Sequence, residues 1–126
     1  MKEILYIFIG GGMGSVFRYL MQLMVNRKLS GVFFPFSWGT FLVNTIGCLF
    51  IGVFYSLSER FQWSMEMRLF LTVGLCGGFT TFSTYANDGL SLLKGELYAM
   101  FFLYTILSVV LGIVSVFVGG YIGKYL

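Results

Sequence analysis

The stretch that decides the fold is Gly74-Leu75-Cys76-Gly77-Gly78-Phe79-Thr80-Thr81-Phe82-Ser83-Thr84-Tyr85, in the middle of a long apolar segment. Its glycines and its Ser and Thr residues are poor material for an uninterrupted helix, because glycine loses the most backbone entropy and hydroxyl side chains compete for backbone hydrogen bonds. At membrane depth, non-helical backbone persists only where protein, water or an ion satisfies its polar groups. The stretch therefore predicts a helix break that serves as an ion site.

The rest of the composition is that of a membrane protein. Of the 126 residues, 58% are hydrophobic and 10% are charged, whereas soluble domains carry about 25% charged residues. No run of charge is long enough to bind nucleic acid. Four apolar segments, residues 4–25, 38–57, 69–93 and 97–121, are each long enough to cross a bilayer, for which about 20 residues suffice. We expect one all-α domain over residues 1–126, with four membrane helices of which the third is broken.

The positive charges are balanced between the two sides that four spans would define. The side of the N-terminus holds Lys2, Arg60, Arg68 and Lys124, and the opposite side holds Arg27, Lys28 and Lys94. Orientation follows the Lys/Arg bias of short loops, so this chain has almost none. The balance predicts insertion in both orientations, and an inverted pair of subunits would resemble the repeats of transporters.

Small residues are spaced for close helix contacts at Gly10/Gly14, Gly74/Gly78 and Gly119/Gly123. Pairs of small residues four apart allow two helix backbones to approach closely. Chance matches are also common in a chain with 17 glycines, so the spacing leaves both interpretations open.

Two polar residues lie inside the first two spans. Arg18 in the first span either extends its charge to the interface, in a structural role, or forms a vestibule charge that attracts anions. Asn44 is deep in the second span, where an amide either bonds across helices or lines a polar cavity. Both alternatives stay open for each residue.

Other candidates lie in the third and fourth spans. Phe82 and Tyr85 are three residues apart and share one helix face if the helix resumes after the break. The positive edge of an aromatic ring can contact a small anion, and hydroxyl residues surround this pair. Tyr104 and Ser108 share a face of the fourth span, with Ser115 further along, either as a hydroxyl track or bonded back to their own helix.

Missing residues exclude several classes. No acidic residue lies mid-span, which argues against a proton-coupled exporter of the small multidrug kind. The chain has no histidine and no nucleophile–base pair, so we expect no enzyme. A cation channel, suggested by Thr72-Val73-Gly74, and a non-transporting scaffold subunit are the remaining alternatives.

Three motifs together resemble the CrcB/Fluc fluoride channels. They are Gly-Gly-Gly-Met-Gly-Ser-Val-Phe-Arg-Tyr at 10–19, Gly-Thr-Phe-Leu-Val-Asn-Thr-Ile-Gly at 39–47, and Gly-Leu-Cys-Gly-Gly-Phe-Thr-Thr-Phe-Ser-Thr at 74–84. The resemblance covers the whole chain in order and spacing. It implies passive, selective export of fluoride across the cytoplasmic membrane, and so fluoride resistance, by an antiparallel dual-topology homodimer.

The resemblance also implies roles for particular residues. A structural sodium ion at the dimer centre would bind the backbone carbonyl groups of Gly77 and Thr80. Fluoride would pass Asn44, the aromatic pair, and a polar track. The implied pathway residues are Asn44, Phe82, Tyr85, Ser83, Thr81, Tyr104 and Ser108. This chain departs from the family pattern at Tyr85, where a phenylalanine is expected, and at Gly112, where a serine is expected.

Overall fold

The computed structural model describes residues 1–29 and 31–126, and its regular elements are helices. The first span is α1 (Lys2–Leu29) and the second is α2 (Trp38–Arg60). The third span is divided into α3 (Met65–Leu69), the π-helical turn η1 (Phe70–Cys76), α4 (Gly77–Phe79) and α5 (Phe82–Lys94). The fourth is α6 (Tyr98–Tyr125). Each of these four spans is long and apolar enough to cross a membrane. This confirms the predicted helical architecture and its interrupted third span.

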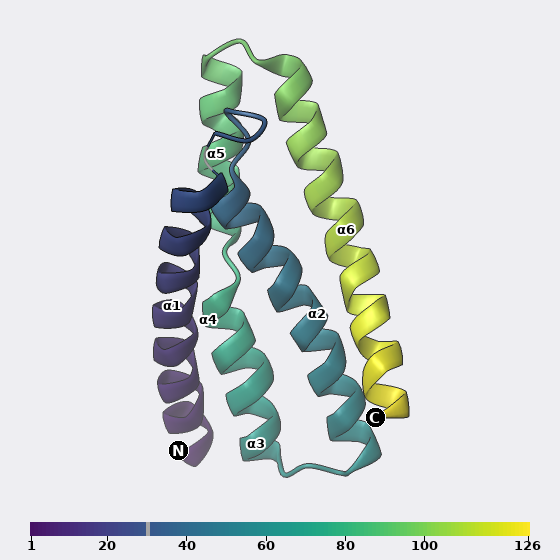
Figure 1. Ribbon diagram of the computed structural model, residues 1–126. Helices are drawn as coiled ribbons and strands as arrows, with labels where there is room; N and C mark the ends of the chain where they lie inside the picture. The colour runs from purple at the N-terminus through teal and green to yellow at the C-terminus, as the bar shows by residue number, and fades with distance from the viewer. Residues whose placement is uncertain (30) are drawn as a thin grey trace.

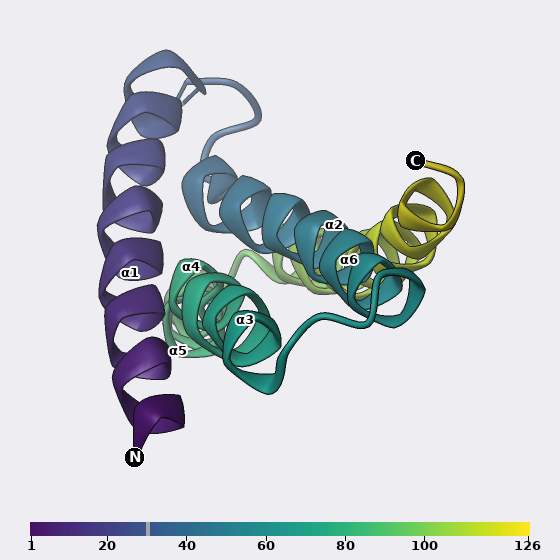
Figure 2. The same cartoon turned by 90° about the horizontal axis from the view of Figure 1, so that it is seen from below.

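The connections alternate between the two ends of the molecule. Both termini and the α2–α3 connection lie at one end, and the α5–α6 connection lies at the other (Figure 1). Helix α1 forms one flank and α6 the opposite flank, with the third span and α2 between them. The view from below shows α1 crossing the other helices obliquely (Figure 2). The third span thus has helices on both sides of its break.

The polar residues that follow the first apolar segment are helical. Asn26, Arg27 and Lys28, which the sequence placed after the span, form the last turn of α1. Basic side chains favour a helix C-terminus because they complement its partial negative charge. Asn26 also replaces a missing cap: Ser37 makes no capping bond to α2, and the Gly39 N–H donates to Asn26 Oδ1 at 3.2 Å instead. The end of α1 therefore fixes the start of α2.

Of the two interpretations left open for the glycine spacings, the structure shows close helix contacts, and they join helices of one chain. Gly10 and Gly14 are buried in α1 against the third span. A Cβ at Gly10 would lie 2.6 Å from the Phe70 carbonyl oxygen. On α6, a Cβ at Gly123 would lie 2.7 Å from Ser56 Cβ on α2. These positions must stay small because backbone or near-backbone atoms occupy the space beside them.

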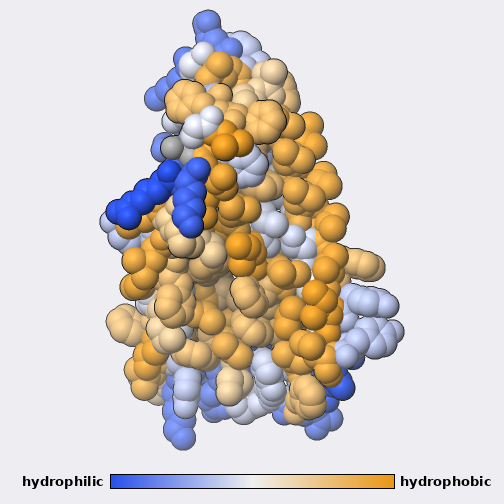
Figure 3. Space-filling model, in the orientation of Figure 1, coloured by the Kyte–Doolittle hydropathy of each residue, from blue (hydrophilic) through white to orange (hydrophobic). Residues whose placement is uncertain are grey.

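The outer surface is mostly apolar. Hydrophobic side chains dominate the middle of the molecule, and strongly hydrophilic ones protrude near its ends and beside the end of α1 (Figure 3). On α6, Ile113 and Phe117 are 67% and 76% exposed. Within the described ranges 1–29 and 31–126, the one salt bridge joins the N-terminal ammonium group to Glu3. This surface suits contact with lipid or with another membrane helix.

Candidate functional site

The break in the third span consists of two extended residues. Helix α4 ends at Phe79 and α5 begins at Phe82. Between them, Thr80 has ψ 159° and Thr81 has φ −148° and ψ 115°, both in the extended region. A π-helical turn precedes the break, and such turns occur frequently at functional sites. The break lies within the stretch that the sequence predicted.

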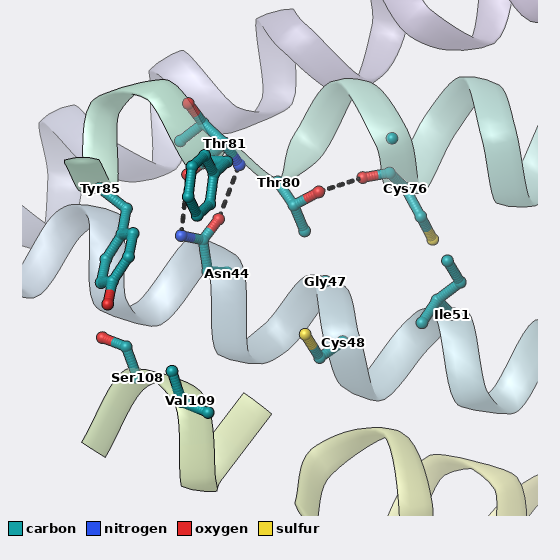
Figure 4. A pocket seen from close by; sticks show the side chains of 12 residues that line it. Asn44, Gly47, Cys48, Ile51, Cys76, Thr80, Thr81, Tyr85, Ser108 and Val109 are labelled. Atoms are coloured by element: carbon teal, nitrogen blue, oxygen red, sulfur yellow. Dashed lines mark hydrogen bonds between the residues drawn. The ribbon is translucent and has the colours of Figure 1, made fainter. Parts of the chain in front are cut away.

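Asn44 bonds to both backbone polar groups of Thr81. The Thr81 N–H donates to Asn44 Oδ1 at 2.7 Å, and Asn44 Nδ2 donates to the Thr81 carbonyl at 3.0 Å (Figure 4). Because the Thr81 N–H is a donor, the amide oxygen must face it, which fixes the orientation of the amide. Of the two alternatives for Asn44, the bond between helices is therefore present. Its amide nitrogen carries a second hydrogen that this pair does not use.

Carbonyl groups at the break lose their helical donors, and for two of them the donor bonds elsewhere. In a continuous α-helix each N–H bonds to the carbonyl four residues earlier. The Thr81 N–H, which would bond to Gly77, goes to Asn44. The Thr84 N–H, which would bond to Thr80, goes to Thr81 Oγ1 at 3.2 Å. The helical donors of the Gly77 and Thr80 carbonyl groups are therefore both diverted at the break.

A pocket of about 330 Å³ opens beside the break, between α2, the third span and α6. Asn44, Tyr85 and Ser108 all line it; Figure 4 shows the Tyr85 and Ser108 hydroxyl groups facing each other and the Asn44 amide directed at the Thr81 backbone. The described residues offer no hydrogen-bond partner to the buried Ser108 Oγ. The predicted site residues that line this pocket are Asn44, Gly77, Thr80, Thr81, Phe82, Tyr85 and Ser108.

The predicted aromatic pair is in contact. The ring centroids of Phe82 and Tyr85 are 5.7 Å apart, with an interplanar angle of 49°. The Tyr85 ring also packs against the Tyr104 ring, with the two centroids 5.3 Å apart. Phe82 is 78% exposed, so most of its ring is accessible at the mouth of the pocket.

Comparison with known proteins identifies the family. The profile of the CrcB-like protein family (Camphor Resistance, CrcB) matches residues 5–120. The chain belongs to the CrcB family. It is 66% identical over 124 residues to the fluoride-specific ion channel FluC of Bacteroides fragilis, with 98% of each chain covered. It is 55% identical over 119 residues to the FluC of Phocaeicola vulgatus, covering 94% of this chain and 96% of that one. The relatives are membrane channels and not enzymes, as the sequence predicted.

Not every predicted site residue of this CrcB-family chain lines the pocket. Tyr104 is fully buried, and its hydroxyl donates to Asp88 Oδ2 at 3.2 Å. Ser83 is exposed on α5, with its hydroxyl 3.4 Å from Thr81 Oγ1. Arg18 lies on α1, where its Nε is buried without a hydrogen-bond partner among the described residues. The structure does not bring these three side chains to the pocket beside the break.

The sequence did not predict a second pocket, of about 350 Å³, whose lining is more polar than that of the first. It lies between the end of α1, the start of α2 and α5. Gln22 Nε2 donates to Thr40 Oγ1 at 3.3 Å on its wall, and Asp88 also lines it. The spacing of Gln22 and Asn26, four apart near the end of a span, is the signal that would have placed polar side chains on one face of α1.

The cation-filter alternative does not fit the conformation. Thr72 and Gly74 lie in the π-helical turn η1. Thr72 Oγ1 donates to the Arg68 carbonyl of its own helix at 2.6 Å. A filter of the potassium-channel kind presents rings of backbone carbonyls to the ion, whereas these backbone groups are part of a helix.

Proposed function

We propose that this chain is a fluoride-selective channel that gives passive export across the cytoplasmic membrane and thereby fluoride resistance. The observation that carries the proposal is the pocket beside the break, which is lined by the Asn44 amide, the Phe82–Tyr85 rings and the Ser108 hydroxyl, a group without a hydrogen-bond partner among the described residues. The described lining contains polar groups and no charged side chain. The relatives' name, fluoride-specific ion channel, supports the same substrate.

The pocket offers a small anion weak, replaceable contacts. The second amide hydrogen of Asn44 and the hydroxyl of Ser108 are donors, whereas the Thr81 hydroxyl donates to Thr84 Oγ1 at 3.1 Å. The edges of the Phe82 and Tyr85 rings add positive electrostatic potential. These groups replace part of the water shell of fluoride without a full charge that would trap it. Conduction requires binding favourable enough for entry and weak enough for release.

The working unit in this proposal is an antiparallel, dual-topology homodimer of single-domain subunits. The pocket is open, Phe82 is 78% exposed, and Gly77 at the break is also exposed. A second copy would cover these groups and close the pathway. The near-equal Lys/Arg distribution supports opposite orientations, because neither loop set dominates insertion.

A structural sodium ion fits the break. The carbonyl groups of Gly77 and Thr80 are those whose helical donors are diverted to Asn44 and to Thr81 Oγ1. Hard cations favour oxygen ligands, and carbonyls of broken helices serve as cation ligands in transporters. In the proposal these two groups from each subunit would hold the ion, whose charge would stabilise the freed carbonyls and join the subunits.

The test is fluoride efflux from liposomes that contain the purified protein, followed with a fluoride electrode while chloride is measured in parallel. We expect fluoride release with chloride retained. If neither anion moves while the protein remains a folded dimer, the scaffold alternative replaces the channel.

A matched pair of variants tests the role of the pocket. Phe82→Ile removes the ring edge at the pocket, and Phe102→Ile changes an exposed phenylalanine on α6 that is not among the pocket residues. Aromatic edge interactions contribute about 0.5–1.5 kcal/mol, so Phe82→Ile should slow efflux by up to about tenfold. Equal rates for the two variants would remove Phe82 from the pathway.

A further inference from the structure

The C-terminal part of α1 combines an apolar stripe with two exposed cations. Leu20, Leu23 and Met24 line a surface pocket of about 380 Å³ together with Arg27 and Lys28. These positions repeat every three or four residues, so they share one face of the helix. The pocket is therefore apolar over two turns and basic at the helix end.

The charges of this pocket are free to meet an external anion. Arg27 and Lys28 are both exposed. No carboxylate of the described residues lies within salt-bridge distance of either, since the single ion pair is that of the N-terminus. Met24 and Leu20, one and two turns further into the span, are 51% and 55% exposed. The exposed apolar side chains thus precede the cations along α1, the helix at one flank of the molecule in Figure 1.

The connection after α1 has the properties of a membrane-interface segment. Phe33 and Phe34 are 71% and 78% exposed, although they are fully apolar. The Trp38 indole N–H holds this connection by donating to the Val32 carbonyl at 2.6 Å. Aromatic residues concentrate at the level of lipid headgroups, so Arg27 and Lys28 lie close to where lipid phosphates are found.

We propose that this surface binds an anionic phospholipid. The phosphate would sit at Arg27 and Lys28, and an acyl chain would run along Leu20, Leu23 and Met24. The commitment to an anionic lipid follows from charge complementarity on an apolar stripe: a free phosphate would leave the stripe uncovered, and a zwitterionic lipid would gain less from two cations. In an inverted pair of subunits, each leaflet would hold one such site.

The test is native mass spectrometry of the purified protein released from vesicles of equal parts phosphatidylglycerol and phosphatidylcholine. The test variant is Arg27→Gln/Lys28→Gln. The matched control, Lys2→Gln/Lys124→Gln, removes the same charge from exposed residues at the opposite end. A basic residue near an anionic surface contributes about 1 kcal/mol, or about fivefold, so the test variant should lose about thirtyfold in its preference for phosphatidylglycerol.

We expect bound phosphatidylglycerol on the wild-type and control proteins and its loss from the test variant. The proposal is overturned if the wild type shows no preference, if the test variant keeps it, or if the control loses it equally, because the last result indicates diffuse charge attraction. Fluoride efflux is measured on the same preparations in phosphatidylcholine vesicles. Absence of efflux from the wild type would contradict the channel proposal and leave the lipid measurement unaffected.

Discussion

Replacing Asn44 by leucine tests whether one amide holds the break open. Leucine is similar in size to asparagine but removes both bonds to Thr81, at 2.7 and 3.0 Å. The freed Thr81 N–H then has one nearby backbone alternative, the Gly77 carbonyl one helical turn earlier. We expect the break to rewind toward helix at this point, and the Gly77 carbonyl to become unavailable to a cation.

The size of the effect follows from the two bonds. Hydrogen bonds between membrane helices contribute about 0.6 kcal/mol on average and at most about 1.7 kcal/mol. Two such bonds give a loss of about 1–3 kcal/mol in the free energy of unfolding, a factor of about five to 150 in the folding equilibrium. A new bond from the Thr81 N–H to the Gly77 carbonyl would recover part of this loss, so we expect a value in the lower half of the range.

The assay is unfolding in mixed micelles titrated with dodecyl sulfate, with sodium and with sodium replaced by N-methylglucamine. The matched control is Thr45→Val, because the Thr45 hydroxyl bonds to the Phe41 carbonyl of its own helix at 2.8 Å. We expect the wild type and the control to be stabilised by sodium, and Asn44→Leu to be less stable and insensitive to it. If Asn44→Leu has the same unfolding midpoint as the control and is still stabilised by sodium, the reasoning is refuted.

Three further predictions concern packing, capping and orientation. Gly10→Ala should lower the free energy of unfolding by about 1–3 kcal/mol, because its Cβ would lie 2.6 Å from a backbone oxygen. Gly12→Ala, whose Cβ would have no described atom within 4 Å, should be neutral or raise it by up to about 1 kcal/mol through helix propensity. Asn26→Ala removes the cap on the Gly39 N–H and should lower the unfolding midpoint by an amount equivalent to about 1 kcal/mol; an unchanged midpoint would show that water caps α2 equally well. In a background without the native cysteines, a cysteine at exposed Glu96 should react with an impermeant maleimide from both faces of intact vesicles, and labelling from one face alone would contradict dual topology.

Local patterns accounted for the elements and for the position of the break. The apolar segments are continuous runs, so their hydropathy does not depend on how the helices pack. The first, second and fourth became single helices, and the third became the interrupted span. The expected break fell at Thr80 and Thr81 because glycine and hydroxyl residues weaken a helix locally. The ends were less predictable: the polar turn at Asn26–Lys28 remained helical, since a helix C-terminus tolerates basic residues.

The sequence by itself determined four apolar helices, a weakened third span and a charge balance without orientation bias, because each is a property of neighbouring residues. Only the tertiary structure decided which polar groups meet. It paired Asn44 with Thr81, 37 residues away, and buried Tyr104 against Asp88, away from the pocket where Ser108 lies. Such pairings depend on the rotation and tilt of whole helices, which are set by close contacts such as those at Gly10 and Gly123. Hydropathy and spacing within one helix do not contain that information.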